Sequence, residues 1–336
     1  MTVIRIIHRL ALALPLALGV VLVAFFYLRA LPGDPVAVIL SQSAAESPQA
    51  IATLRAQLHL NEPLLSQLAY FLANLVHGSL GYSFVQHVPV STLIGQALPA
   101  TIELGFGALA FAALIGIPLG VIGGWRRAGT GDRIGTFITI LAVSLPEFWL
   151  GLVLIVVLAA YLKWLPAAGE IGVAVQLRAV TGMPVLDALL TGNVPALMSA
   201  LRHLILPSVA LGTPMVAVIT RVLSASLHET KWLPYITVAR AKGLTERQVL
   251  LRHALRNAWI PTVTVTGLNF GILLGGNMVV ETVFAWPGLG RLVVQSIFSR
   301  DYPVVQGAIL VYGLTFILIN LLVDVVVTLL NPQVTL

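Results

Sequence analysis

Residues 235–261 read YITVARAKGLTERQVLLRHALRNAWIP and form the most basic stretch of a mostly apolar chain. Against the single acid Glu246, its basic side chains are Arg240, Lys242, Arg247, Arg252 and Arg256. Gly243 readily adopts the left-handed conformation that ends a helix, and Thr245 with Gln248 three residues on has the pattern of a capping box. The stretch therefore predicts two short helices joined by a tight turn. It is either a docking surface or a solvated loop that is basic because of membrane topology.

The composition places the chain in a membrane. Apolar residues make up 58% of it and charged residues 10%, whereas soluble domains carry about 25% charged residues. The formal net charge is +6, but the basic residues cluster between apolar runs instead of forming a stripe with aromatic residues, so we expect no nucleic-acid partner. The chain has no cysteine, which excludes disulfides and thiolate metal ligands.

Six apolar runs are long enough to cross a hydrocarbon core about 30 Å thick. The predicted spans are 10–28, 104–125, 134–162, 204–220, 258–280 and 302–323. They indicate an all-α membrane protein with one domain, residues 1–336. The first run lacks a clear cleavage site, so we interpret it as a retained span and not as a signal peptide.

The distribution of Lys and Arg predicts the orientation. These residues are concentrated before the first span, between the second and third spans, and between the fourth and fifth. Because cytoplasmic segments carry the excess of positive charge, both termini are expected on the cytoplasmic side together with residues 235–261. Residues 31–100 then form the longest extracytoplasmic segment.

The motifs of several enzyme classes are absent from the sequence. There is no G-x-x-x-x-G-K-[ST] phosphate loop, so we expect no binding or hydrolysis of ATP by this chain alone. There is no H-E-x-x-H or G-x-S-x-G motif, and the histidines lack metal-ligand spacing. These absences argue against a membrane enzyme and predict neither a metal site nor a catalytic residue.

Four acidic residues lie in or beside the predicted spans, where a charged side chain is costly and is therefore a candidate for function. Glu103, Glu281 and Asp324 are each near the end of a span, so pairing with a neighbour or with water is the simpler interpretation. Glu147 lies within the third span directly after Pro146, which is expected to kink the helix. It is the stronger candidate for a polar path or an ion relay.

The fifth span is the best candidate for a helix that lines a path. Its glycines recur every four residues, which allows close packing within the chain or with a partner; they are Gly267, Gly271 and Gly275. Two asparagines lie two turns apart on a neighbouring face. The predicted path residues are Glu147, Asn269, Asn277, Glu281 and Trp286. The alternative is that the glycines serve only packing and that the tryptophan is an interfacial anchor.

Several stretches, in order along nearly the whole chain, match one family. They are PGDP (32–35), LPATIEL (98–104), SLPEFW (144–149), TVARAKGL (237–244), HALRNA (253–258), Pro261, ETVFAWPGLGR (281–291) and RDYPVVQG (300–307). With them the chain resembles ABC importer permeases of the dipeptide/oligopeptide/nickel group, and the long segment after the first span resembles their B-type subunit. It departs from the family's usual pattern at Ser79 and Thr237, which leaves the substrate open.

That resemblance implies the type I ABC importer permease fold and one half of a channel in the bacterial inner membrane, surrounded by lipid. A homologous second permease would supply the other half, two ATPase subunits would bind ATP and Mg, and an extracytoplasmic binding protein would deliver substrate. No cofactor is implied in this chain. The residues implied in ATPase coupling are Ala239, Arg240, Ala241, Lys242, Gly243, Leu244, Arg247, His253 and Arg256.

The substrate class stays open at this point. A dipeptide or oligopeptide is expected, and nickel or a metal chelate, glutathione and haem are the alternatives within the same machinery. An ion-coupled carrier or a membrane enzyme that uses Glu147 and Asp324 is a hypothesis from another class. Carriers of that kind often have inverted repeats and paired broken helices, and the sequence shows neither.

Overall fold

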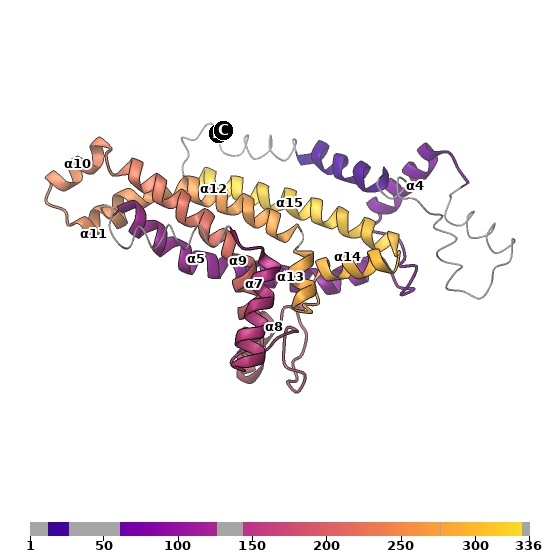
Figure 1. The fold of residues 1–336 in the computed structure, drawn as a ribbon. Coiled ribbons are helices and arrows are strands. Elements are labelled where there is room, and N and C mark those ends of the chain that lie inside the picture. The colour runs from indigo at the N-terminus through magenta and orange to yellow at the C-terminus, as the bar shows by residue number, and fades with distance from the viewer. Residues whose placement is uncertain (1–12, 27–60, 126–143, 276, 331–336) are drawn as a thin grey trace.

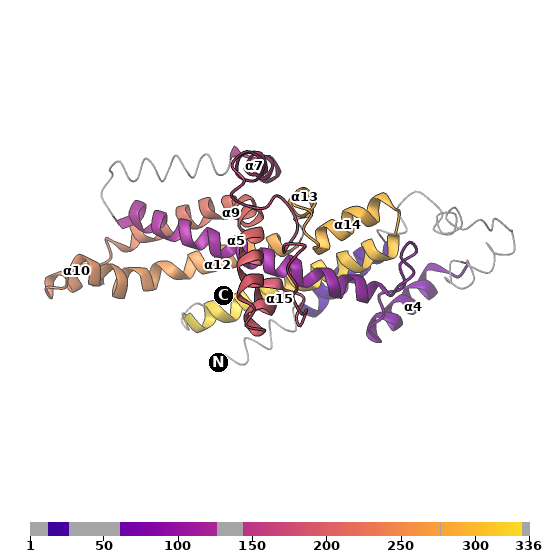
Figure 2. The same cartoon turned by 90° about the horizontal axis from the view of Figure 1, so that it is seen from below.

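The computed structural model describes residues 13–26, 61–125, 144–275 and 277–330, and every regular element within these ranges is a helix. Four long helices run alongside one another in an elongated bundle (Figures 1 and 2). They are α5 (Val90–Trp125), α9 (Val194–Thr230), α12 (Leu255–Leu274) and α15 (Tyr302–Leu330). The central helix is α9, because it packs along both α5 and α12. The prediction of an all-α protein is confirmed for the described ranges.

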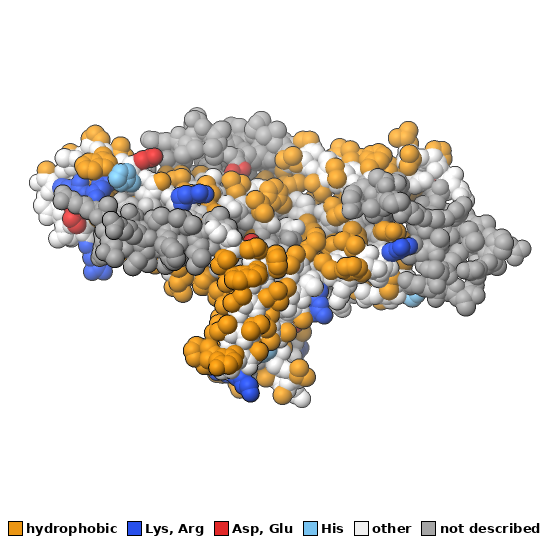
Figure 3. Space-filling view, in the orientation of Figure 1, with side chains coloured by type: hydrophobic (Ala, Val, Ile, Leu, Met, Phe, Trp, Pro, Cys, Tyr) orange, Lys and Arg blue, Asp and Glu red, His pale blue; other side chains and the backbone are white. Residues whose placement is uncertain are grey.

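Shorter helices lie at the two ends of the bundle and along one side (Figure 1). Their bounds are Ala13–Phe26, α4 (Leu64–Val76), α7 (Glu147–Leu154), η1 (Ile155–Tyr161), α8 (Pro184–Leu190), α10 (Pro234–Ala241), α11 (Glu246–Gln248), η2 (Val249–Ala254), α13 (Met278–Val283) and α14 (Leu289–Phe298). The elements η1 and η2 are π-helices. Helices α10 and α11 form one end of the molecule, and α4 and α14 lie at the other. Hydrophobic side chains cover the arm built by α7 and η1 (Figure 3).

Three of the helices are long and apolar enough to cross a membrane: α5, α9 and residues Tyr302–Thr328 of α15. They contain the predicted spans 104–125, 204–220 and 302–323. The helices extend beyond the first two of these spans, because α5 begins at Val90 and α9 at Val194. The predicted span 10–28 lies partly outside the described residues, and the described part is helical from Ala13 to Phe26.

The early start of α9 has a local cause. The side chain of Asn193 accepts a hydrogen bond from the N–H of Ala196 at 3.1 Å, which caps the helix. Pro195 lies in the first turn, where its missing N–H removes no helical hydrogen bond. A hydropathy count misses this first part because it is less apolar than the rest of the helix.

The third and fifth spans differ from their predictions at a break. Pro146 has φ −61° and ψ 135°, so α7 begins only at Glu147, and that residue opens a helix instead of lying within a kinked one. A residue before proline avoids helical backbone, which places the break at Leu145. Residues 134–143 of the predicted third span lie outside the described part. Within the predicted span 258–280 the helix is interrupted, because α12 ends at Leu274 and a separate helix, α13 (Met278–Val283), follows.

Glycines set the close packing of the long helices. A Cβ at Gly116 would lie 3.0 Å from the Cβ of Ile219, and one at Gly120 would lie 2.9 Å from the Cβ of Leu223. A side chain at either position would therefore push α5 away from α9. On α12, a Cβ at Gly271 would lie 3.2 Å from the ring of Phe316 on α15. The small residues of both helices serve packing within the chain.

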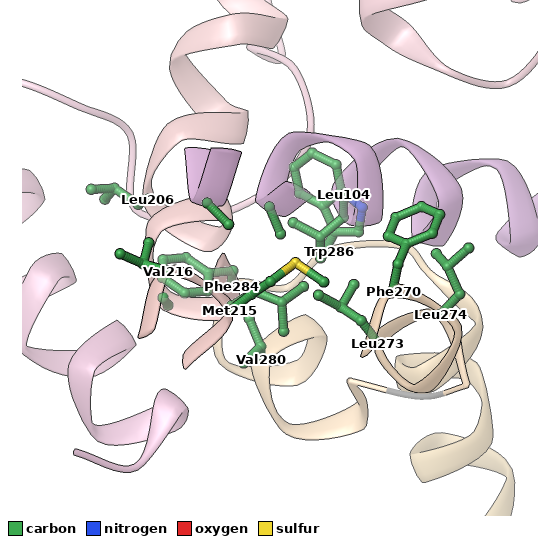
Figure 4. Packing of buried hydrophobic residues seen from close by; sticks show 14 of the residues in the cluster. Leu104, Leu206, Met215, Val216, Phe270, Leu273, Leu274, Val280, Phe284 and Trp286 are labelled. Carbon is green, nitrogen blue, oxygen red and sulfur yellow. The ribbon is translucent and has the colours of Figure 1, made fainter. Parts of the chain in front are cut away.

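The main hydrophobic core lies where α5, α9 and α12 meet the segment that follows α12 (Figure 4). Trp286 and Phe284 are buried there beside Leu104 of α5, Met215 of α9 and Phe270 of α12. The core therefore joins three long helices to residues 280–286. The sequence prediction had placed the fifth span's end at residue 280, at the start of this segment.

Candidate functional site

Residues 234–261, called the docking segment here, have the predicted helix–turn–helix form. Helix α10 begins at Pro234, and Gly243 after it has φ +78°. The N–H of Gly243 donates to the carbonyl of Arg240 at 2.9 Å. Thr245 and Gln248 form the predicted capping box, in which each side chain accepts the other's backbone N–H. Helix α11 continues through η2 into α12 without a loop.

The docking segment is held on the bundle by its apolar face. Ile236 and Ala239 of α10 and Val249 of η2 are buried against Leu223 and Leu227 of α9. The opposite face is open and basic. Of the residues implied in ATPase coupling, Ala241, Lys242, Gly243, Arg247 and Arg256 are exposed, and Arg240, Leu244 and His253 are half-buried. Ala239 is the one of them that is buried, and Leu244 packs against the same hydrophobic cluster.

A cluster of cations and an aromatic ring joins the docking segment to the end of α5. The Nζ of Lys231 donates to the backbone carbonyl of Trp125 at 2.8 Å and lies 5.8 Å from the centre of its ring. The guanidinium of Arg240 lies 5.5 Å from the same ring and donates to Glu246 at 2.7 Å. This hydrogen bond and the charge of Arg240 hold the pKa of Glu246 below its usual range. The sequence analysis did not identify Trp125 or Lys231.

At a distance from the docking segment, residues 281–291 fold against α5 in what we call the 281–291 clamp. The Oε1 of Glu281 accepts a hydrogen bond from the hydroxyl of Thr101 at 2.8 Å, and Oε2 accepts the N–H of Arg291 at 3.0 Å. The indole N–H of Trp286 donates to the carbonyl of Ala100 at 2.8 Å. The two motifs 98–104 and 281–291 therefore meet in one buried set of hydrogen bonds.

The clamp leaves no room for larger residues. A Cβ at Gly288 would lie 2.6 Å from the hydroxyl oxygen of Thr101 and would also collide with the Glu281 carboxylate. Glu281 and Trp286, both predicted path residues, are 0% exposed. The structure places them in the interior of the chain, where Glu281 pairs with its neighbours.

Two further buried carboxylates hold loops in the same manner. Asp301 accepts the hydroxyl of Ser83 and the N–H of Phe84, the latter at 3.0 Å, and so fixes a turn to the start of α15. Asp187 in α8 accepts the N–H and the hydroxyl of Thr181 at 2.7 and 2.6 Å. Burial alone would raise its pKa, but this set of hydrogen bonds outweighs burial and lowers the pKa of Asp187.

A cavity of about 570 Å³ lies between the start of α7, the middle of α9 and α13. It is lined by Leu145, Pro146, Glu147, Phe148, Pro214, Asn277, Met278, Val279 and Val280. The cavity brings together two predicted path residues from different spans. A third, Asn269, is not among the lining residues, and its amide nitrogen donates to the carbonyl of Val265 on its own helix.

Glu147 is the polar side chain of this cavity whose role the fold does not explain. Within the part of the chain that the structure describes, no hydrogen bond or ion pair reaches its carboxylate. A carboxylate in the first turn of a helix gains only about 0.3–1 kcal/mol from the helix dipole. A charged side chain at the centre of a bilayer costs roughly 2.5–3.5 kcal/mol. If Glu147 lies within the membrane, as the sequence predicts, the helix start does not account for its charge.

Comparisons with known proteins cover nearly the whole chain. Residues 116–336 match the family described as "Binding-protein-dependent transport system inner membrane component", and residues 3–105 match the family of its N-terminal part. The "Dipeptide transport system permease protein DppB" of Alkalihalophilus pseudofirmus is 40% identical, over 97% of this chain and 98% of that protein. The protein of the same name from Escherichia coli K12 is 38% identical, over 98% of each chain.

Two more comparisons concern a further peptide permease and a solved structure. The "Di/tripeptide transport system permease protein DppB" of Pseudomonas aeruginosa is 38% identical, over 98% of each chain. Among solved structures, a chain of the MetNI methionine ABC transporter superposes with a TM-score of 0.50 at 20% identity, and the match covers 71% of this chain and 96% of that one. At this identity the match shows a shared fold only.

Proposed function

The chain belongs to the family of binding-protein-dependent transport system inner membrane components, and from that premise we propose that it is a permease subunit of an ATP-driven importer of dipeptides and short peptides. The peptide substrate is supported by relatives named for dipeptide and di/tripeptide transport that match this chain over nearly its whole length. A homologous second permease completes the channel. A binding protein on the outer side delivers the peptide.

Two ATPase subunits drive the transporter, and one of them receives the docking segment. The observation that carries this assignment is the form of the segment, whose apolar side is fixed to α9 while its open side carries Lys242, Arg247 and Arg256. ATP and Mg are bound by the ATPase subunits. Because α11 continues through η2 into α12, a movement of the docked segment is passed directly to a long helix of the bundle.

The chain crosses the inner membrane six times with both termini in the cytoplasm. The crossings are the N-terminal helix, α5, the segment that ends in α7 and η1, α9, α12 and α15. The apolar length of α5, α9 and α15 and the basic docking segment support this arrangement. The MetNI-like fold supports the type I permease architecture.

The path for the peptide runs past the cavity at the start of α7. Glu147 and Asn277 line that cavity, and Asn269 lies on α12 nearer to the docking segment. Glu281 and Trp286 have no exposed surface, so they do not contact the peptide. Their role in transport is to hold the segment that borders the path in position through the 281–291 clamp.

The function is tested with the complete transporter. Purified complexes that contain both permeases and both ATPases are reconstituted in liposomes, and the uptake of radiolabelled alanyl-alanine is measured with and without ATP and the binding protein. Uptake that requires both is the expected result. Uptake that is independent of ATP, or ATP hydrolysis by this chain purified alone, would contradict the proposal.

A further inference from the structure

The cavity at the start of α7 has the chemistry of a site for a small cation with an apolar body. Its volume of about 570 Å³ is within the usual range for small-molecule sites, which are mainly apolar and contain few polar groups. Here the polar side chains are the carboxylate of Glu147 and the amide of Asn277. Leu145, Phe148 and Met278 contribute apolar surface.

The other anchoring carboxylates of the chain show what a structural role requires. Glu281 accepts hydrogen bonds from Thr101 and from the backbone of Arg291, and Asp301 accepts them from Ser83 and Phe84. Each of these acids closes a contact between segments far apart in the sequence. Glu147 closes no such contact among the described residues, and its side chain is left to the cavity.

The second polar residue of the cavity is also available to a ligand. The amide nitrogen of Asn277 donates to the carbonyl of Leu273 at 2.5 Å. Among the described residues no hydrogen bond is made to its side-chain oxygen, which can still accept one. A carboxylate and an amide oxygen on the wall of one cavity are both acceptors. An ammonium group has three donors and no acceptor, so it matches this pair.

We propose that Glu147 and Asn277 bind the α-ammonium group of the transported peptide as it passes through this chain. The inference rests on the proposed function, because a free amino terminus is the cation that all short peptides have in common. Ion pairing at Glu147 would recognise that group, while the apolar wall accepts different side chains without strong preference. The cavity would therefore select for a peptide terminus and not for a sequence.

The test separates this chain from the binding protein, which has its own preference for peptides. Equilibrium binding of two radiolabelled peptides, alanyl-alanine and N-acetyl-alanyl-alanine, is measured on the purified complex of permeases and ATPases with no binding protein present. The variants are Glu147→Gln and, as a matched control, Glu229→Gln, which neutralises an exposed acid near the end of α9. The uptake assay with the binding protein is run on the same preparations.

The native complex is expected to bind alanyl-alanine more tightly than its acetylated form. Glu147→Gln should weaken the binding of alanyl-alanine by at least about tenfold, as expected when one partner of a desolvated charge pair is removed. It should leave the acetylated peptide unaffected, and Glu229→Gln should change neither. Stimulation of ATP hydrolysis by the binding protein shows that each variant is assembled.

Two results would overturn the inference. One is equal binding of both peptides by the native complex, including no binding of either. The other is a Glu147→Gln complex that still discriminates between them. If the native transporter imports no peptide at all in the uptake assay, the proposed function fails first. If it imports alanyl-alanine while the binding results go against Glu147, only the inference about the cavity fails.

Discussion

Substitution of Gly243 is the sharpest perturbation of the docking segment. The residue has φ +78°, and a Cβ at this position would meet no atom within 4 Å. A side chain therefore adds no collision, and its cost is the left-handed backbone alone, which is roughly 1–2 kcal/mol for an L-residue. A free energy of that size changes the population of the bent segment by about 5–30-fold. Gly243→Val is thus expected to leave the transporter assembled but poorly coupled.

The measurement is the number of ATP molecules hydrolysed for each peptide imported by reconstituted transporters. Gly192→Val is the matched control, because Gly192 has φ +65° and also has no atom within 4 Å of its Cβ position. It lies in the turn between α8 and α9, outside the docking segment. Both variants carry the same kind of backbone strain, so both should lose similar stability. Only Gly243→Val should raise the ATP used for each peptide.

Two results would refute this reasoning. If Gly243→Val imports peptide with the native ratio of ATP to peptide, the bend has no part in coupling. If Gly192→Val raises the ratio as strongly, the effect belongs to loss of stability in general. Melting curves of the purified complexes show whether the two substitutions are in fact equally destabilising.

Three further substitutions test other contacts. Trp125→Leu removes the aromatic face beside two cations and is expected to raise the ATP used per peptide, with recovery in Trp125→Phe; an unchanged ratio in the leucine variant would deny the ring a role in coupling. Gly288→Ala places a Cβ 2.6 Å from the Thr101 hydroxyl oxygen and should lower the free energy of unfolding by about 1–3 kcal/mol through overpacking. An unchanged melting temperature would show that the clamp can rearrange to accept the methyl group. The chain has no native cysteine, so a single cysteine can be placed at Asn269 or at Asn277. Each is expected to react with a water-soluble thiol reagent at a rate that depends on the bound nucleotide. A position that stays unreactive in every nucleotide state does not line the path.

The docking segment could be predicted because its signals are local. A capping box relates Thr245 to Gln248, and a left-handed glycine acts on its own turn, so neither depends on the rest of the fold. The same holds for the start of the long helix α9 after Asn193, where the prediction followed hydropathy and missed the capping residue. The break after α12 also had a sequence signal in the pair Gly275–Gly276, since adjacent glycines are a common cause of helix kinks.

The 281–291 clamp could not be predicted from local signals. Thr101 and Glu281 are separated by 180 residues, and Ser83 and Asp301 by 218. Hydropathy identified Glu281 as an acid near the end of a span, but nothing in the sequence names the hydroxyl that satisfies it. The resemblance grouped the motifs 98–104 and 281–291 without showing that they touch. Their contact explains why both contain small or hydroxyl residues where a larger side chain would collide.

Helix α5 connects the two ends of this arrangement. Its last residue, Trp125, contacts Arg240 of the docking segment through its ring, and its Ala100–Thr101 region holds the 281–291 clamp. The glycines of α5 bring it into close contact with α9 along most of its length. We therefore propose that α5 and α9 carry a displacement of the docking segment to the clamp as one unit.

The cavity lies beside the break between α12 and α13, and this position relates it to a movement of the docking segment. Helix α12 is continuous with the docking segment, whereas α13 leads directly into the clamp. The backbone between Leu274 and Met278 is the point at which these two attachments can separate, because no continuous helix joins them there. Asn277 lies in this break and lines the cavity with Glu147. If the proposals above hold, a peptide at that position is bound where a movement of the docking segment would change the shape of the wall.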